Sequence, residues 1–155
     1  MVPMKKLLIL SPYDGFSHGF WREGLADYLA GKFEIVECTL PPRFFSWRQR
    51  GNSLSFALKP ELQQPFDLVV ATSMTDLSGL RGLNRHLSSV PAIVYFHENQ
   101  FAYPGNNTKG LLERQLTSIY TALSADRLFF NSEFNRSTFL VGAKKLLGRM
   151  PDEVP

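Results

Sequence analysis

The sequence contains a single cysteine, Cys38, among its 155 residues. One thiol cannot close an internal disulfide, so the chain lacks the crosslinks of small secreted domains. It also lacks an apolar run of the roughly 18 residues that a membrane-spanning helix needs, and its amino terminus has no secretory signal. These absences predict a cytoplasmic protein that does not associate with membranes.

Several motifs of enzymes and cofactor-binding proteins are missing as well. The chain has no P-loop, no nucleophile elbow and no serine-triad spacing. The loop before the first expected helix lacks the three-glycine spacing of dinucleotide-binding proteins. With one cysteine and three scattered histidines, no metal-ligand cluster is visible. The sequence therefore predicts neither a bound metal nor a resident cofactor.

What the chain does contain is sufficient for one globular domain. Hydrophobic residues make up 44% of the sequence and charged residues 20%, which argues against intrinsic disorder. Short apolar segments, expected as strands, alternate with amphipathic ones. We expect strands at 5–12, 33–39, 66–71, 92–96 and 127–130. We expect helices at 16–29, 76–87, 111–125 and 133–147, with a short one at 53–58 inside an irregular segment from 40 to 65.

This alternation predicts a parallel, doubly wound sheet of the three-layer, Rossmann-like α/β class. The strand at 66–71 is apolar on both faces and is placed centrally, beside the first strand. The strand at 33–39 is amphipathic and is placed at an edge. The expected order is 2-1-3-4-5, whose switch point lies between the first and third strands.

The strand expected at 92–96 is followed by four polar residues, His97, Glu98, Asn99 and Gln100. Ligands of open α/β sheets bind at the carboxyl ends of the strands. Histidine can act as acid or base near neutral pH, glutamate can accept a hydroxyl proton, and amides both donate and accept. A solvated loop would carry similar residues, so both interpretations stand. Residues 103–107 are rich in turn formers and are expected to fold over a ligand.

The loop after the first strand carries Gly15, Ser17 and His18, just before or within the start of the helix at 16–29. Free backbone N–H groups at a helix start favour an anion. The alternative is that Gly15 permits a tight turn and Ser17 caps the helix.

Two further loops follow the third and fifth strands. Ser73 and Asp76 are candidates for ligand contact, although Thr75 or Ser73 would also cap the next helix and place Asp76 in its first turn. Asn131 and Ser132 are similar, because either would cap the helix at 133–147.

Arginines and aromatic rings alternate in the irregular segment, at Arg43, Phe44, Phe45, Trp47, Arg48 and Arg50. Guanidinium groups hold phosphates and aromatic faces stack unpaired bases, so Arg43, Trp47, Arg48 and Arg50 are expected to bind nucleic acid. The net charge of +3 is compatible with such a partner. A charged amphipathic loop packed on the surface would look the same.

Several of these motifs together resemble one family over nearly the whole chain. They are the segments 11–18, 40–51, 95–104, 125–132 and 149–152, of which the run His97-Glu98-Asn99-Gln100 followed by Tyr103-Pro104 is the most specific. The chain resembles the amino-terminal domain of the tRNA-queuosine mannosyltransferase family, whose members are retaining glycosyltransferases of the GT-B fold.

The resemblance implies that residues 1–148 form the acceptor-side domain and that 149–155 begin a linker to a missing donor-binding domain. It implies GDP-mannose as the donor, queuosine in tRNA as the acceptor, and no activity for this chain alone. His97 and Glu98 would be catalytic, with Asn99 and Gln100 orienting hydroxyls. Gly15, Ser17 and His18 would approach the donor diphosphate or the acceptor. A stand-alone RNA-binding module and a non-catalytic, flavodoxin-like ligand-binding domain are the alternatives.

Overall fold

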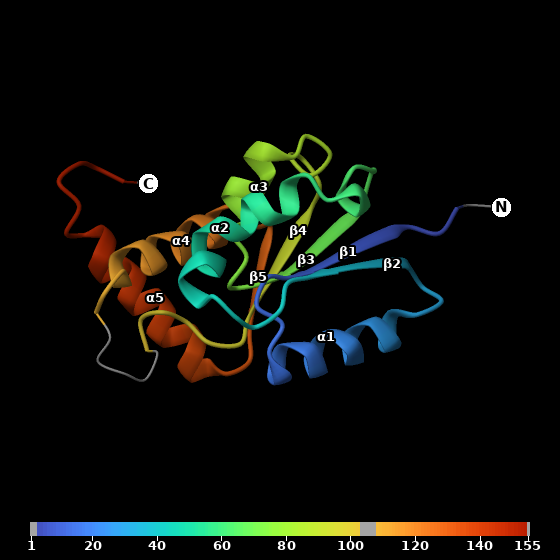
Figure 1. Ribbon diagram of the computed structural model, residues 1–155. Helices are drawn as coiled ribbons and strands as arrows, with labels where there is room; N and C mark the ends of the chain where they lie inside the picture. Colours follow the sequence, from blue (N-terminus) through green and yellow to red (C-terminus); the bar gives the residue numbers. More distant parts are fainter. Residues whose placement is uncertain (1–2, 103–107, 155) are drawn as a thin grey trace.

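A computed structural model describes residues 3–102 and 108–154. Its five strands form a single parallel sheet in the order β2-β1-β3-β4-β5 (Figure 1). The strands are β1 (Lys6–Ser11), β2 (Glu34–Thr39), β3 (Leu68–Thr72), β4 (Ala92–Phe96) and β5 (Arg127–Phe130). The expected Rossmann-like fold and strand order are therefore confirmed. The turn-rich segment 103–107 lies outside the described residues, so the prediction that it covers a ligand stays a prediction.

The helices alternate with these strands. They are α1 (Phe16–Leu29), α2 (Phe45–Ala57), α3 (Leu77–Leu83), α4 (Leu111–Leu123) and α5 (Glu133–Leu147), with a short 3-10 helix at Pro60–Leu62. Helix α1 lies on one side of the sheet and α2, α3 and α4 on the other, while α5 follows β5 (Figure 1). Phe139 of α5 packs on Phe96 and Phe130 at the ends of β4 and β5.

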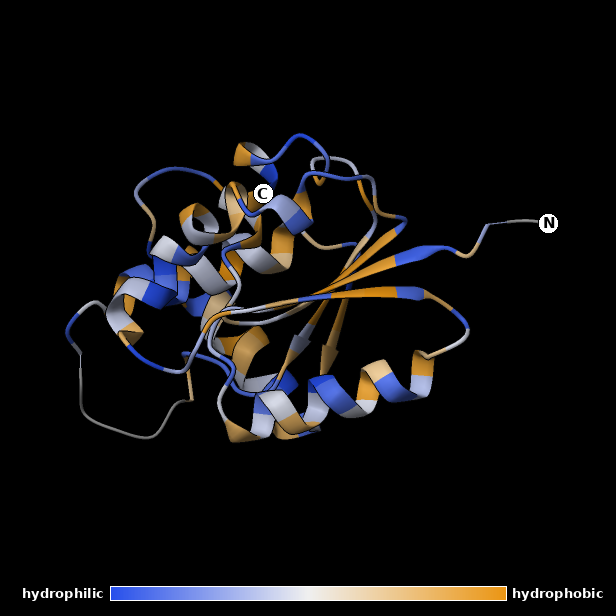
Figure 2. Ribbon diagram, turned by 45° about the vertical axis from the view of Figure 1, so that its right-hand side comes forward, coloured by the Kyte–Doolittle hydropathy of each residue, from blue (hydrophilic) through white to orange (hydrophobic). Residues whose placement is uncertain are grey.

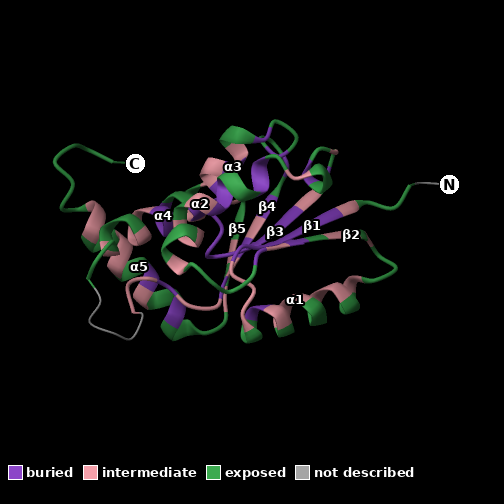
Figure 3. Ribbon diagram, viewed as in Figure 1, coloured by how far each residue is buried: buried purple, intermediate pink, exposed green. Residues whose placement is uncertain are grey.

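The central strands are buried on both faces, which explains their uninterrupted apolar sequences. In β1, Leu8 and Leu10 face the core shared with α2 and α3, whereas Leu7 and Ile9 face α1. All four side chains are fully buried. Figure 2 shows hydrophobic residues concentrated along the strands, and Figure 3 shows that, within the sheet, β1, β3 and β4 carry most of the buried positions. Burial on both faces is the expected environment of a parallel sheet.

Helix α2 differs from the sequence prediction, which gave a short helix at 53–58 within an irregular segment. The structure has a helix of 13 residues, Phe45–Ala57. Gly51, Asn52 and Ser53 are poor helix formers, but Asn52 is fully buried and its side chain bonds outside the helix. Its Nδ2 donates to the Met74 carbonyl (3.1 Å) and its Oδ1 accepts from the Asp76 amide (2.9 Å). Tertiary contacts therefore override local propensity here.

The entry into α2 has an unusual backbone. Phe44 precedes the first helical residue with φ of 58°, in the left-handed region, and its side chain is 64% exposed. It is the one residue other than glycine with positive φ in the described parts of the chain.

The predicted helix at 76–87 also differs from the structure, because α3 ends at Leu83. Among residues 3–102 and 108–154, no helix has the length and apolar character to span a bilayer.

Candidate functional site

The loops after β1, β3 and β4 meet at the carboxyl edge of the sheet, as expected from the strand order. His18, in the first turn of α1, lies against His97, with ring centroids 4.2 Å apart and the rings nearly perpendicular. Ser73, after β3, donates from its hydroxyl to the Glu98 carbonyl (3.3 Å). Residues from the start of α1 and from the loops after β3 and β4 thus form one cluster, which we call the edge cluster: His18, Ser73, His97 and Glu98.

His18 is buried and held in one orientation. Its Nδ1 lies 2.9 Å from the Tyr13 carbonyl, which can only accept, so Nδ1 carries a proton. Its Nε2 lies 3.5 Å from a carboxylate oxygen of Glu98. Burial acts to lower the pKa of His18, but the Glu98 carboxylate, the Tyr13 carbonyl and the charge of Asp14 outweigh it, and the pKa is raised above 6.5. His18 therefore favours the cationic form beside Glu98.

His97 has the opposite environment. Its ring is enclosed by the rings of Trp21 (5.0 Å between centroids), Tyr95 (4.8 Å) and His18. Burial, and then the nearby charge of His18, lower the pKa of His97 to about 4, although Glu98 opposes them. Neither ring nitrogen has a hydrogen-bond partner in the described part of the chain. His97 is thus a neutral imidazole at pH 7 with its hydrogen-bonding capacity unused.

Arg22 of α1 braces the loop that leads to His18. Its Nε and Nη2 donate to the two carboxylate oxygens of Asp14 (3.1 and 2.9 Å), and its Nη1 donates to Glu37 of β2. The Asp14 bond, against the effect of burial, raises the pKa of Arg22 further. Sequence analysis missed Arg22, because nothing in the local pattern pairs it with Asp14 or Glu37.

Gly15 occupies the N-cap position of α1, and no side chain caps this helix. The alternative that Ser17 caps the helix is therefore wrong, and its side chain is exposed. Gly15 directly precedes α1 and Ser17 is the neighbour of His18 in that helix, so both predicted residues stand next to the edge cluster. Their contact with a substrate stays a prediction.

Asp76 caps α3, whereas Thr75 or Ser73 was expected to do so. Its Oδ1 accepts from the Gly79 amide (3.1 Å) and its Oδ2 accepts from the Ser53 hydroxyl (2.9 Å). The residue is 1% exposed. A carboxylate with these partners already has a structural role.

Asparagine side chains tie the loop after β4 to α5. Asn99 donates to the side-chain oxygen of Asn135 (2.7 Å) and accepts from the Phe101 amide (2.9 Å). Asn131 donates to the His97 carbonyl (2.6 Å). Ser132 caps α5 by accepting from the Asn135 amide (3.1 Å), so the capping alternative is confirmed for Ser132. These bonds fix the backbone of His97; Asn135, which sequence analysis missed, lies at their centre.

The predicted nucleic-acid-binding residues lie on or just before α2 rather than in a loop, because the segment is helical. Trp47 is 78% exposed. Arg50 is largely exposed, with its Nε 3.8 Å from Asp76. Arg43 lies over the ring of Phe44, at 5.5 Å. Residues three apart in a helix are neighbours on its surface, so Trp47 and Arg50 project from one side of α2. Arg48, about 100° from Trp47, projects from another.

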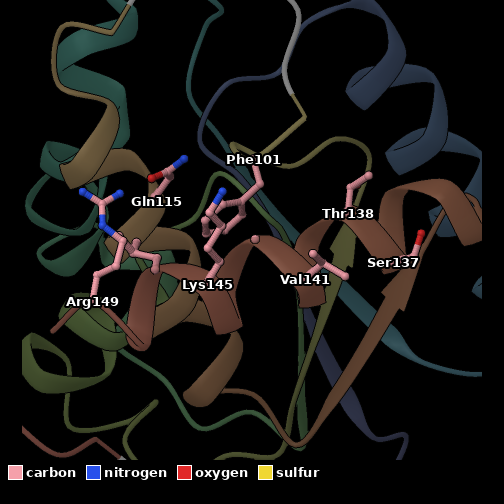
Figure 4. A pocket seen from close by; sticks show the side chains of 9 residues that line it. Phe101, Gln115, Ser137, Thr138, Val141, Lys145 and Arg149 are labelled. Atoms are coloured by element: carbon pink, nitrogen blue, oxygen red, sulfur yellow. The ribbon is translucent and has the colours of Figure 1, made fainter.

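A hollow of about 230 Å³ is lined by His97, Glu98 and Asn131, and three others lie in the described part of the chain. A groove of about 560 Å³ lies between α2 and α4, and a narrow cavity of about 20 Å³, with Gln100 in its wall, reaches Ser73 and Glu98. A third, of about 500 Å³, lies between Phe101, Gln115 of α4, Lys145 of α5 and Arg149 just after that helix (Figure 4). In the described residues no group of histidine, cysteine and carboxylate side chains is placed to hold a metal ion.

The parallel sheet and the histidine–carboxylate cluster at its carboxyl edge define an α/β domain of the Rossmann-like class. Residues 6–155 match the family described as the N-terminal domain of tRNA-queuosine alpha-mannosyltransferase, and the chain belongs to this family. It is 36% identical over 151 residues to the tRNA-queuosine alpha-mannosyltransferase of Drosophila melanogaster. The alignment covers 94% of this chain but 39% of that relative. No solved structure matches the chain.

Proposed function

We propose that this chain is the acceptor-side domain of a cytoplasmic retaining glycosyltransferase of the GT-B fold, which transfers mannose from GDP-mannose to queuosine in tRNA. The observation that carries the proposal is the edge cluster, in which a neutral His97 with unused nitrogens lies beside His18 and Glu98. Family membership supports the same activity, because the Drosophila relative is named as a tRNA-queuosine alpha-mannosyltransferase.

The two histidines suit different parts of sugar transfer. When the acceptor hydroxyl attacks the anomeric carbon, the bond to the diphosphate breaks and negative charge develops on the leaving phosphate. His18, which favours its cationic form, and the free N–H groups near Gly15 and Ser17 would stabilise that charge. His97, which is neutral, would accept a hydrogen bond from a reacting hydroxyl.

The remaining site residues would orient the substrates. Glu98 keeps His18 charged and has a side chain 34% exposed, so it also has room to accept from a sugar or acceptor hydroxyl. Gln100 would donate to a hydroxyl from the wall of the cavity beside Glu98, and Ser73, whose proton is engaged by the Glu98 carbonyl, would accept from one. Asn99, Asn131, Ser132 and Asp76 would act mainly by holding the loops in place. Trp47, with Arg43, Arg48 and Arg50, would contact the tRNA.

Residues 1–148 would form this domain, and the segment from 149 would lead to a second, donor-binding domain. The chain spans 39% of the length of the Drosophila relative, which supports a partition of the activity between two parts. We therefore expect this chain alone to transfer no sugar.

The experiment uses the full-length protein with a panel of nucleotide sugars and total tRNA, and follows sugar incorporation by mass spectrometry. We expect a hexose on queuosine with GDP-mannose alone among the donors. tRNA from cells that lack queuosine is the control and should gain no mass. Equal incorporation into both tRNA pools would contradict queuosine as the acceptor, and no incorporation with any donor would contradict the proposed activity.

A further inference from the structure

The groove between α2 and α4, which we call the α2–α4 groove, has walls of two chemical kinds. Phe45 and Tyr120 provide aromatic surface, and Tyr120 is 42% exposed. The charged lining consists of three cations, Arg50, Lys109 and Arg114, and one carboxylate, Glu113. Its volume of about 560 Å³ lies within the roughly 300–1,000 Å³ of small-molecule sites. Rings combined with net positive charge are the features that hold a nucleotide.

The groove adjoins the edge cluster. Gln49, Arg114 and Thr117 line both the groove and the narrow cavity that reaches Ser73 and Glu98. At about 20 Å³ this cavity holds no more than a water molecule. A ligand that occupies both sites must therefore run over the surface from one to the other, as a chain molecule does.

Gln49, at the junction, has a polar group without a partner. Its side-chain nitrogen is buried and makes no hydrogen bond within residues 3–102 and 108–154. Buried amide donors are nearly always paired in folded proteins. An acceptor on a ligand in the groove would supply the missing bond.

We propose that the α2–α4 groove binds the nucleotide next to the target nucleoside in the acceptor RNA. This inference rests on the proposed function, in which the target nucleoside lies at the edge cluster. To reach that cluster, a nucleoside must leave the stack of its neighbours, and the adjacent base then loses a stacking partner. Phe45 and Tyr120 replace that partner, Arg50 neutralises a phosphate, and Gln49 donates to the base or ribose.

The first test measures the Kd of the full-length protein for tRNA and the KM for tRNA. Tyr120→Leu should raise both at least about fivefold, the lower end of what stacking one base contributes, and leave the KM for the nucleotide sugar unchanged. Tyr120→Phe keeps the ring and should retain the parent affinity. Tyr28→Leu removes an exposed tyrosine from α1 on the other side of the sheet and is the matched control.

The second test is independent of those substitutions. A tRNA carrying 4-thiouridine beside the queuosine is irradiated with the parent protein, and the crosslinked peptide is identified by mass spectrometry. A crosslink to a peptide of α2 or α4 is expected.

The outcomes separate this inference from the proposed function. If the parent enzyme glycosylates tRNA but Tyr120→Leu behaves like Tyr28→Leu and the crosslink falls elsewhere, the groove assignment is overturned and the proposed function stands. If the parent enzyme modifies no tRNA, the proposed function fails first. If the Tyr120→Leu protein does not fold, the position of the crosslink in the parent protein decides whether the groove assignment holds.

Discussion

The imidazole rings of His18 and His97 lie edge to face, with their centroids 4.2 Å apart. Their pKa values are shifted in opposite directions. The pKa of His97 is lowered to about 4 by burial and by His18, whereas that of His18 is raised by Glu98 and Tyr13 against the effect of burial. At pH values between the two pKa values, the pair carries one extra proton, and that proton resides on His18. A cation and a neutral base are thus placed in contact.

The depressed pKa of His97 should appear as a pH dependence of stability. Between pH 4 and 6.5 the unfolded chain protonates this histidine and the folded chain does not, so the free energy of unfolding falls as the pH falls through this window. His18 is protonated in both states over most of the window, because its pKa is raised. In urea denaturation at several pH values, His97→Phe should lose less stability than the parent between pH 6.5 and 4. Parallel curves would show that His97 is not the cause.

Substitutions at His97 should separate its chemistry from its packing. His97→Phe keeps a ring among Trp21, Tyr95 and His18 and removes both unpaired nitrogens, so its stability should stay within about 1 kcal/mol of the parent. In the full-length enzyme its turnover should fall about 100-fold or more. His97→Ala should lose similar turnover and also about 1–3 kcal/mol of stability. Full activity in His97→Phe would contradict a role for the ring nitrogens.

Asp76 should matter for stability. Asp76→Ala removes the N-cap of α3 and leaves the buried Ser53 hydroxyl without this acceptor, so we expect a loss of about 2–3 kcal/mol. Asp152→Ala, at an exposed carboxylate in the tail, is the control and should change stability little. Chemical denaturation measures both. A loss below 0.5 kcal/mol (taken as roughly the limit for an ordinary surface site) would contradict this structural role.

Gly142 of α5 allows the ring of Phe101 to pack against the helix. A Cβ at this position would overlap the Phe101 side chain, so Gly142→Ala should displace the ring, reshape the hollow in Figure 4 and cost about 1–3 kcal/mol. Gly24 of α1 has open space around the same position. Gly24→Ala should instead stabilise the protein by up to about 1 kcal/mol. Thermal denaturation of the two variants should therefore shift in opposite directions.

The arginines before and within α2 should make tRNA binding salt-dependent. Replacing Arg43, Arg48 and Arg50 together by alanine should flatten the slope of log affinity against log salt by up to about 2.1–2.7, because each contacted phosphate contributes about 0.7–0.9. Trp47→Ala should weaken binding by about 1–3 kcal/mol without changing the slope. The triple control replaces Arg85, Arg127 and Arg136, which are exposed elsewhere. An unchanged slope in the first triple variant would remove these residues from the RNA interface.

The sheet was predictable because its signal is local. Leu7 to Leu10 are apolar without interruption, and a strand buried on both faces needs that pattern. The amphipathic strand β2 lies at an edge, as predicted. Helix α2 was predicted too short, because Gly51 and Asn52 weaken the local signal while the bonds from Asn52 to Met74 and Asp76 hold the helix.

The candidate site was predictable to a similar extent. His97 and Glu98 follow an obvious buried strand, and parallel topology alone brings them near His18. The hydrogen bonds from Arg22 to Asp14 and Glu37 could not be predicted from the sequence. The same holds for the bond from Asn99 to Asn135, which lies 36 residues further along the chain. Such partners become neighbours only when the chain folds, and no spacing rule connects them.

The left-handed backbone conformation of Phe44 favours glycine at this position over any residue with a Cβ. Glycine adopts such a φ freely, whereas a residue with a Cβ is disfavoured by about 1–2 kcal/mol. Phe44→Gly would therefore relieve the entry into α2, and the phenyl ring, 64% exposed, has little burial with which to offset the strain. The Arg43 guanidinium over the ring offsets only about 0.5–1 kcal/mol of this strain. We therefore expect the main advantage of an aromatic side chain at position 44 to come from contact with a partner.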